Sequence, residues 1–116
     1  MILIYFFYLF AGDAVFVTDF NLHMVFRIGL DCQSFSPLVP SGILHRPSGI
    51  AVDDAGNLMV ADARGHSLKV FAPNGQLLGQ LDTFSPNSPL NTPTDVTLLK
   101  AGFVATLDNN GRVTIF

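Results

Sequence analysis

The feature that most constrains this chain is an internal repeat with a spacing of 43 to 46 residues. An offset of 43 places residues 15–28 on residues 58–71, and an offset of 46 places residues 47–62 on residues 93–108. Each unit is too short to form a domain and must bury its apolar faces against its neighbours. Repeats of 40 to 50 residues that contain several short strands are typical of β-propeller blades.

The best-defined unit, residues 47–81, predicts four strands separated by polar turns. Gly56, and Gly102 at the equivalent position of the next unit, provide the positive φ that a tight turn requires. Alternation places Leu68 and Val70 on one face of their strand. The four expected strands are residues 49–52, 58–61, 67–71 and 76–81.

One turn of each unit begins with an aspartate, at Asp19, Asp62 and Asp108. An aspartate carboxylate at such a position accepts backbone N–H groups of its own turn. We therefore expect all three aspartates to be structural turn residues.

Composition agrees with one all-β domain. The chain has 116 residues, of which 49% are hydrophobic and 13% charged, with eleven phenylalanines and no tryptophan. The six basic residues are scattered and the net charge is −3, which disfavours RNA as a ligand unless the fold brings them together. The single cysteine, Cys32, excludes an internal disulfide and is consistent with a cytoplasmic location.

The apolar N-terminal segment, residues 1–12, has three interpretations. It lacks the basic residues that precede the apolar part of a secretory signal, and Asp13 ends it well short of the ~20 residues of a membrane span. A buried strand is favoured, because residues 6–9 lie 43 residues before the strand at 49–52. A signal-like segment and a frayed terminus are the alternatives, and no membrane association is expected.

Residues 46–81 resemble an NHL repeat. The resemblance rests on Pro47, the run 49–53 (Gly-Ile-Ala-Val-Asp), the run 56–57 (Gly-Asn), the run 60–62 (Val-Ala-Asp) and, after them, His66, Val70 and Phe71. The sequence departs from the family pattern where Leu22 and Gly65 replace its asparagine, and where Met24 and Ser67 replace its arginine.

This resemblance implies a partial β-propeller of about 2.5–3 four-stranded antiparallel blades that does not close. Blade 1 is expected at residues 1–46, with its first strand uncertain, blade 2 at 47–92, and blade 3 at 93–116 without its outer strand. Propellers of this family close with about six blades, so we expect a fragment of a longer protein that aggregates or oligomerises when isolated.

No catalytic or metal-binding constellation is evident, so no enzyme activity and no cofactor are expected. His23 and His66 occupy equivalent positions one blade apart, and nothing in the sequence makes them converge on one ion as zinc ligands must. Cys32 has no assignable base, and no nucleophile elbow or phosphate-binding loop is present.

Three function classes follow from the resemblance. The favoured one is a protein-interaction module, comparable to the substrate-recognition domain of tripartite-motif ubiquitin ligases, whose RING and B-box modules are not in this sequence. RNA stem-loop binding and a metal-dependent lyase or lactonase are the alternatives. The residues expected to contact a partner lie in the inter-strand turns: Asn21, Leu22, His23, Arg64, Gly65, His66, Asn109 and Asn110.

Overall fold

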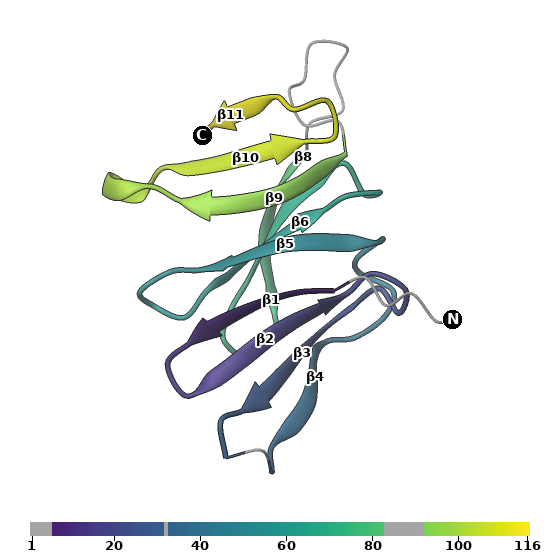
Figure 1. The fold of residues 1–116 in the computed structure, drawn as a ribbon, viewed down its shortest axis with the longest axis vertical. Helices are drawn as coiled ribbons and strands as arrows, with labels where there is room; N and C mark the ends of the chain where they lie inside the picture. Colours follow the sequence, from purple (N-terminus) through teal and green to yellow (C-terminus); the bar gives the residue numbers. More distant parts are fainter. Residues whose placement is uncertain (1–5, 32, 83–91) are drawn as a thin grey trace.

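The computed structural model describes residues 6–31, 33–82 and 92–116, which form three separate antiparallel sheets (Figure 1). Blade 1 contains β1 (Phe6–Ala11), β2 (Ala14–Asp19), β3 (Met24–Gly29) and β4 (Phe35–Val39). Blade 2 contains β5 (Pro47–Val52), β6 (Leu58–Asp62), β7 (Ser67–Phe71) and β8 (Leu77–Asp82). Blade 3 contains β9 (Pro93–Leu98), β10 (Val104–Asp108) and β11 (Val113–Ile115), with the 3-10 turn η1 (Lys100–Gly102) between its first two strands.

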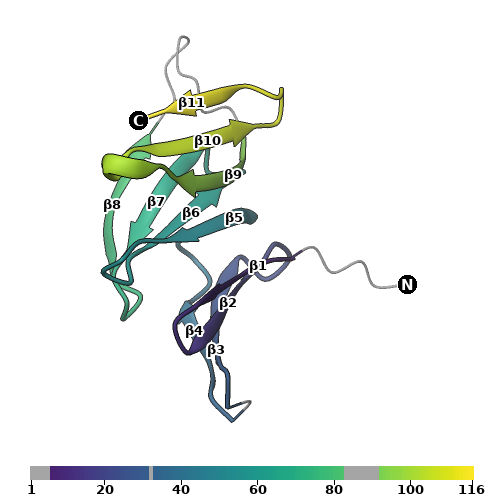
Figure 2. The same ribbon diagram turned by 60° about the vertical axis from the view of Figure 1, so that its left-hand side comes forward.

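The sheets are arranged as successive blades of an open propeller. Within each sheet the strands pair in chain order, and β5, the first strand of blade 2, lies against both β1 and β9. Figures 1 and 2 show the three sheets fanning out in chain order, with blade 2 in the middle. The expected all-β partial propeller is therefore confirmed, and the described residues do not close into a ring.

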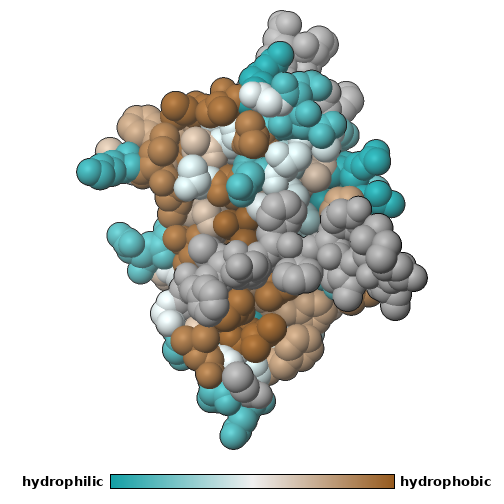
Figure 3. All heavy atoms as spheres, in the orientation of Figure 1, coloured by the Kyte–Doolittle hydropathy of each residue, from teal (hydrophilic) through white to brown (hydrophobic). Residues whose placement is uncertain are grey.

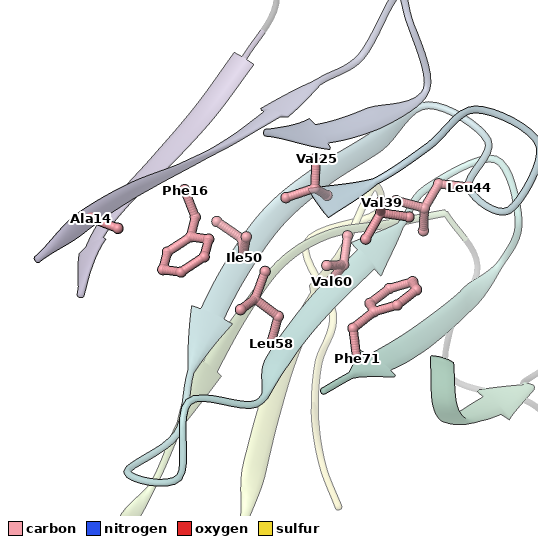
Figure 4. Close-up of a cluster of buried hydrophobic side chains, with 9 residues drawn as sticks. All are labelled: Ala14, Phe16, Val25, Val39, Leu44, Ile50, Leu58, Val60 and Phe71. Atoms are coloured by element: carbon pink, nitrogen blue, oxygen red, sulfur yellow. The ribbon is translucent and has the colours of Figure 1, made fainter. Parts of the chain in front are cut away.

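Two apolar clusters lie between successive blades, because each strand presents alternate side chains to opposite faces. The cluster between blades 1 and 2 contains Ala14 and Phe16 of β2 and Leu58 and Val60 of β6 (Figure 4). The other face of β6 contributes Met59 and Ala61 to the cluster with blade 3. Leu68 belongs to this second cluster and Val70 packs against it, as the alternation predicts.

Hydroxyl groups join neighbouring blades beside these clusters. Thr18 Oγ1 donates to the Ser48 carbonyl oxygen at 2.7 Å, which connects blade 1 to blade 2. Ser48 Oγ lies 3.1 Å from the Pro93 carbonyl oxygen, which connects blade 2 to blade 3. Both hydroxyl-bearing residues are buried, so each bond satisfies a polar group that would otherwise be costly to remove from water.

Gly49 permits a close approach between blades 2 and 3. A Cβ at this position would lie 2.5 Å from the Asp95 Cα on β9. Only a residue without a side chain lets β5 and β9 approach this closely.

The structure extends the expected strands at two places. Residues 33–42 are rich in serine and proline, which are typical of loops, but β4 occupies most of this segment as the outer strand of blade 1. Pro37 is accommodated because β4 is an edge strand, whose outward N–H positions need no partner in the ladder. Near the N-terminus, β1 includes the strand predicted from the repeat at residues 6–9.

Among the described residues no helix has the length and apolar character needed to cross a lipid bilayer.

Candidate functional site

One edge of the blade array gathers the residues that the repeat places in equivalent turns. This edge, the pocket face, carries the turns 19–24, 62–67 and 108–113 and the segments that lead into β5 and β9. A cavity of about 460 Å³ opens there between the blades. Its lining consists of Phe20, Ser48, Ala63, Arg64, Thr92, Thr94 and Asn109.

The turns of blades 1 and 3 are closed by their aspartates as the sequence predicts. Asp19 Oδ1 accepts the backbone N–H groups of Asn21 and Leu22, both at 2.9 Å. Asp108 Oδ1 accepts those of Asn110 and Arg112, also at 2.9 Å. These bonds fix the turn backbone, so the side chains of the turn project from a defined frame.

Asp62 differs from that expectation, because its carboxylate bonds outside its own turn. Asp62 Oδ1 accepts the backbone N–H of His45 at 2.7 Å, and Asp62 Oδ2 accepts Lys69 Nζ at 2.6 Å. The Lys69 ammonium also donates to Ser67 Oγ at 2.7 Å. The Asp62 side chain is 1% exposed and that of Lys69 11%, so blade 2 holds a buried ion pair.

The position of Lys69 explains why Asp62 behaves differently from Asp108. Thr114 stands at the equivalent position of blade 3, where the sequences 67–71 and 112–116 align. Asp108 Oδ2 is buried, and no hydrogen bond to it is found among the described residues. A lysine on the neighbouring strand therefore diverts the Asp62 carboxylate from the turn into an ion pair.

The two repeat-equivalent histidines hold the connections between blades. His23 Nδ1 accepts the backbone N–H of Arg46 at 2.8 Å, and His66 Nδ1 accepts that of Thr92 at 3.1 Å. The two donors occupy equivalent positions, each directly before the proline that begins the next first strand. All four residues have positive φ, between 49° and 58°, so the same tight geometry recurs at both junctions.

Arginine side chains bring positive charge to the pocket face. Arg64 lines the cavity, and the Arg46 guanidinium lies 5.0 Å from the centroid of Phe20, which also lines it. Arg112 lies in the β10–β11 turn of the same edge. Within the part of the chain that the structure describes, the ion pairs are Arg27–Asp13 and Lys69–Asp62, so none of these three arginines is neutralised by an acidic side chain.

The structure places the predicted contact residues in different surroundings. Arg64 and Asn109 meet at the cavity, whereas Asn21, Leu22 and Asn110 are exposed on the surrounding turns. His23 and His66 are engaged in the junctions described above. Gly65 packs directly against the Asp62 carboxylate, which leaves no room for a side chain there.

The five remaining lining residues were not predicted. They could have been found from the repeat, because Phe20, Ala63 and Asn109 are related by the same offsets of 43 and 46. Ser48 and Thr94 are likewise 46 residues apart. Equivalent turn positions of successive blades lie at the same edge of a propeller and can line one cavity. A turn sequence considered by itself does not reveal this.

No three histidine, cysteine, aspartate or glutamate side chains come together to form a metal site in the described ranges 6–31, 33–82 and 92–116.

Comparison with known proteins supports the propeller architecture. The family model for the NHL repeat matches residues 44–71. The fold resembles that of virginiamycin B lyase from Staphylococcus aureus, with a TM-score of 0.69 and 13% identity over 94% of this chain and 39% of the lyase chain. It also resembles a chain of the nidogen/laminin complex, with a TM-score of 0.72 and 22% identity over 90% of this chain and 40% of the other. A streptogramin B lyase structure gives a TM-score of 0.69 and 14% identity, over 94% of this chain and 39% of the other.

The chain thus spans about 40% of the length of these solved structures. A search of curated protein sequences finds no match.

Proposed function

Because this chain carries an NHL repeat and folds as blades of a β-propeller, we propose that its pocket face is a non-catalytic binding surface for a partner protein. The observation that carries the proposal is the cavity of about 460 Å³ between the blades. This volume lies in the range of ~300–1,000 Å³ that is usual for ligand pockets. Its lining combines an aromatic ring, hydroxyl groups, an amide and an arginine, which is the composition of a recognition site.

The charges on the pocket face indicate the chemistry of the partner. Arg64 lines the cavity and has no ion pair in the described residues, and Arg46 lies over Phe20 at its edge. A carboxylate presented to Arg64 would form a charge-assisted hydrogen bond, and an apolar side chain would cover Phe20 and Ala63. We therefore propose an acidic peptide segment with a neighbouring apolar residue as the ligand.

Two further considerations support a protein partner. The exposed turns around the cavity offer side chains that differ from blade to blade on a fixed frame, which is how propellers and other scaffolds present contacts. One of the similar solved structures belongs to a complex between nidogen and laminin. In a ligase of the tripartite-motif kind, the pocket face would be the surface that selects the substrate.

The experiment is a selection of phage-displayed random dodecapeptides on the immobilised chain. The proposal requires enriched sequences to contain aspartate or glutamate and to lose at least about tenfold in affinity for an Arg64→Ala variant, because a charged hydrogen bond is removed. A Lys100→Ala variant is the matched control, since Lys100 lies in η1 beyond the opposite edge of blade 3. Enriched peptides without acidic residues, or equal binding to both variants, would refute the proposal.

RNA is a second candidate ligand because the fold gathers basic residues that the sequence scatters. Arg46, Arg64 and Arg112 all lie at the pocket face. Fluorescence anisotropy with a structured RNA at two salt concentrations tests this alternative. RNA binding through these residues should weaken as salt rises and weaken further in Arg64→Ala.

A further inference from the structure

The outer faces of the two end blades carry the two complementary halves of a blade-to-blade interface. Blade 3 turns Leu107, Val113 and Ile115 outward, and their exposed fractions are 40%, 63% and 61%. Figure 3 shows hydrophobic residues gathered at the upper left of the molecule, in the part where Figure 1 places blade 3. A hollow of about 180 Å³, lined in part by Ala105, Leu107 and Val113, opens on this face.

The repeat itself shows what covers such a face. Ala61 and Leu68 occupy in blade 2 the positions that Leu107 and Val113 occupy in blade 3, and they are only 0% and 1% exposed. They are buried because the next blade packs on them with Val96 of β9 and its neighbours. The outward face of blade 3 is therefore the kind of surface on which a following blade packs.

Blade 1 provides the matching surface on its own outward face. Strand alternation directs Val15 and Val17 away from the cluster that contains Ala14 and Phe16. Their equivalents in blade 2 are Leu58 and Val60, which are 0% exposed because blade 1 packs on them. The outward face of blade 1 thus has the position and apolar character of a surface that packs on a preceding blade.

We propose that this chain self-associates head to tail, so that blade 1 of one copy packs on blade 3 of a second copy. The described residues supply three blades, whereas β-propellers close with about four to eight. Two copies joined through both pairs of faces would form a six-bladed ring, a closed arrangement in which no apolar end face stays exposed. A second copy of this chain is the partner that we propose for each end face, because it carries the complementary face at the repeat-equivalent positions.

The contact can be placed by analogy with the interface between blades 1 and 2. Val25 and Val60 lie there in one buried cluster (Figure 4). Their repeat equivalents on the two end faces are Val113 and Val17. In the proposed dimer, Val113 of each copy therefore lies near Val17 of the other.

Sedimentation equilibrium on the isolated chain tests the proposal. The wild-type chain should have the mass of a dimer at about 100 µM. The variants Val113→Asp and Val17→Asp should each be monomeric. Their self-association should be at least about 100-fold weaker, because each would bury a charge without a partner in the interface. An equimolar mixture of the two variants should regain a dimer, since it retains one intact pair of faces. A Leu22→Asp variant is the control, because Leu22 is 53% exposed in a turn of the pocket face and outside both end faces.

The proposal is overturned by a wild-type chain that stays monomeric, by a mixture that does not regain the dimer, or by assembly that continues without limit past the dimer. Cross-linking provides a readout that does not depend on aspartate being tolerated at Val17. In a Cys32→Ser background, chains with Val17→Cys should form disulfides with chains that carry Val113→Cys, and neither should cross-link to itself. Equal cross-linking within either single population would contradict the head-to-tail arrangement.

Discussion

His66 Nδ1 accepts the backbone N–H of Thr92 at 3.1 Å, and this bond ties a turn of blade 2 to the first strand of blade 3. The same bond recurs one blade earlier between His23 and Arg46. The histidine of the repeat is thus a structural connector between blades. It positions the segments that border the cavity, and the contacts expected from the turns depend on it.

Replacing His66 by alanine should destabilise the chain by about 1–2 kcal/mol. The hydrogen bond from the Thr92 N–H to His66 Nδ1 is lost, and losing a hydrogen bond of a partly buried donor is costly. Urea unfolding at fixed protein concentration measures the change. The free energy of unfolding of Asp54→Ala, a change in an exposed turn at the opposite edge, should stay within about 0.5 kcal/mol of the wild-type value. An equal loss in both variants would show that His66 does not stabilise the blade junction.

The buried ion pair between Lys69 and Asp62 predicts a strongly non-additive pair of substitutions. Lys69→Met should cost about 3 kcal/mol or more, because it leaves the Asp62 carboxylate buried without its cation. Adding Asp62→Asn to Lys69→Met should recover part of that loss, since the uncompensated charge is gone. Thermal unfolding of the two single variants and the double variant completes the cycle, and additive losses would show that the pair does not couple.

The turn between β5 and β6 predicts a pH-dependent contribution to stability. Burial by itself raises the pKa of Asp53, but hydrogen bonds from the side chain and backbone of Asn57 and from the backbone of Ala55 and Gly56 outweigh it and bring the pKa below its ordinary value of 3.8. The ionised carboxylate is therefore stabilised in the folded state. Its contribution is complete above the ordinary pKa and is lost as pH falls through the lowered one.

The stability difference between the wild-type chain and Asp53→Ala should accordingly be constant from about pH 7 to pH 5 and shrink below about pH 4. Chemical unfolding across this pH range measures it. Asp54→Ala provides the control in the same turn, because no hydrogen bond to its side chain is found in the described structure. A difference that grows on acidification would contradict the assignment.

Gly49 and Gly79 form a matched pair of positions for glycine-to-alanine substitution. Gly49→Ala places a Cβ against the Asp95 backbone and should cost about 1–3 kcal/mol, because β5 and β9 must separate. Gly79→Ala meets no atom within 4 Å and should be neutral or slightly stabilising. Differential scanning fluorimetry ranks the two variants, and equal melting temperatures would show that the blades are not packed as closely as described.

The repeat was sufficient to predict the fold because strand alternation and glycine turns act locally. The strand at 67–71 and the turn glycines at 56 and 102 are where the sequence places them. The strand β4 is not evident from the sequence because its serines and prolines are typical of loops, and only its pairing with β3 along the outer edge makes it a strand. Tertiary context overrides local preference most easily at such edges.

The candidate site was only partly predictable for a related reason. Turn position identified Arg64 and Asn109, but the cavity also requires residues from first strands and junctions that are distant in sequence. The expectation that Asp62 bonds within its own turn was wrong. The presence of Lys69 on the neighbouring strand, rather than the turn sequence, decides where the Asp62 carboxylate bonds. Both differences arise from contacts between segments.

Hydrogen–deuterium exchange of the chain with and without the tightest acidic peptide from the selection tests the binding account most directly. Protection should appear in the turns 62–67 and 108–113 and around residues 46–48, which border the cavity. The turns 53–57 and 72–76 at the opposite edge should exchange unchanged. Protection confined to that opposite edge, with the pocket face unaltered, would contradict the central claim.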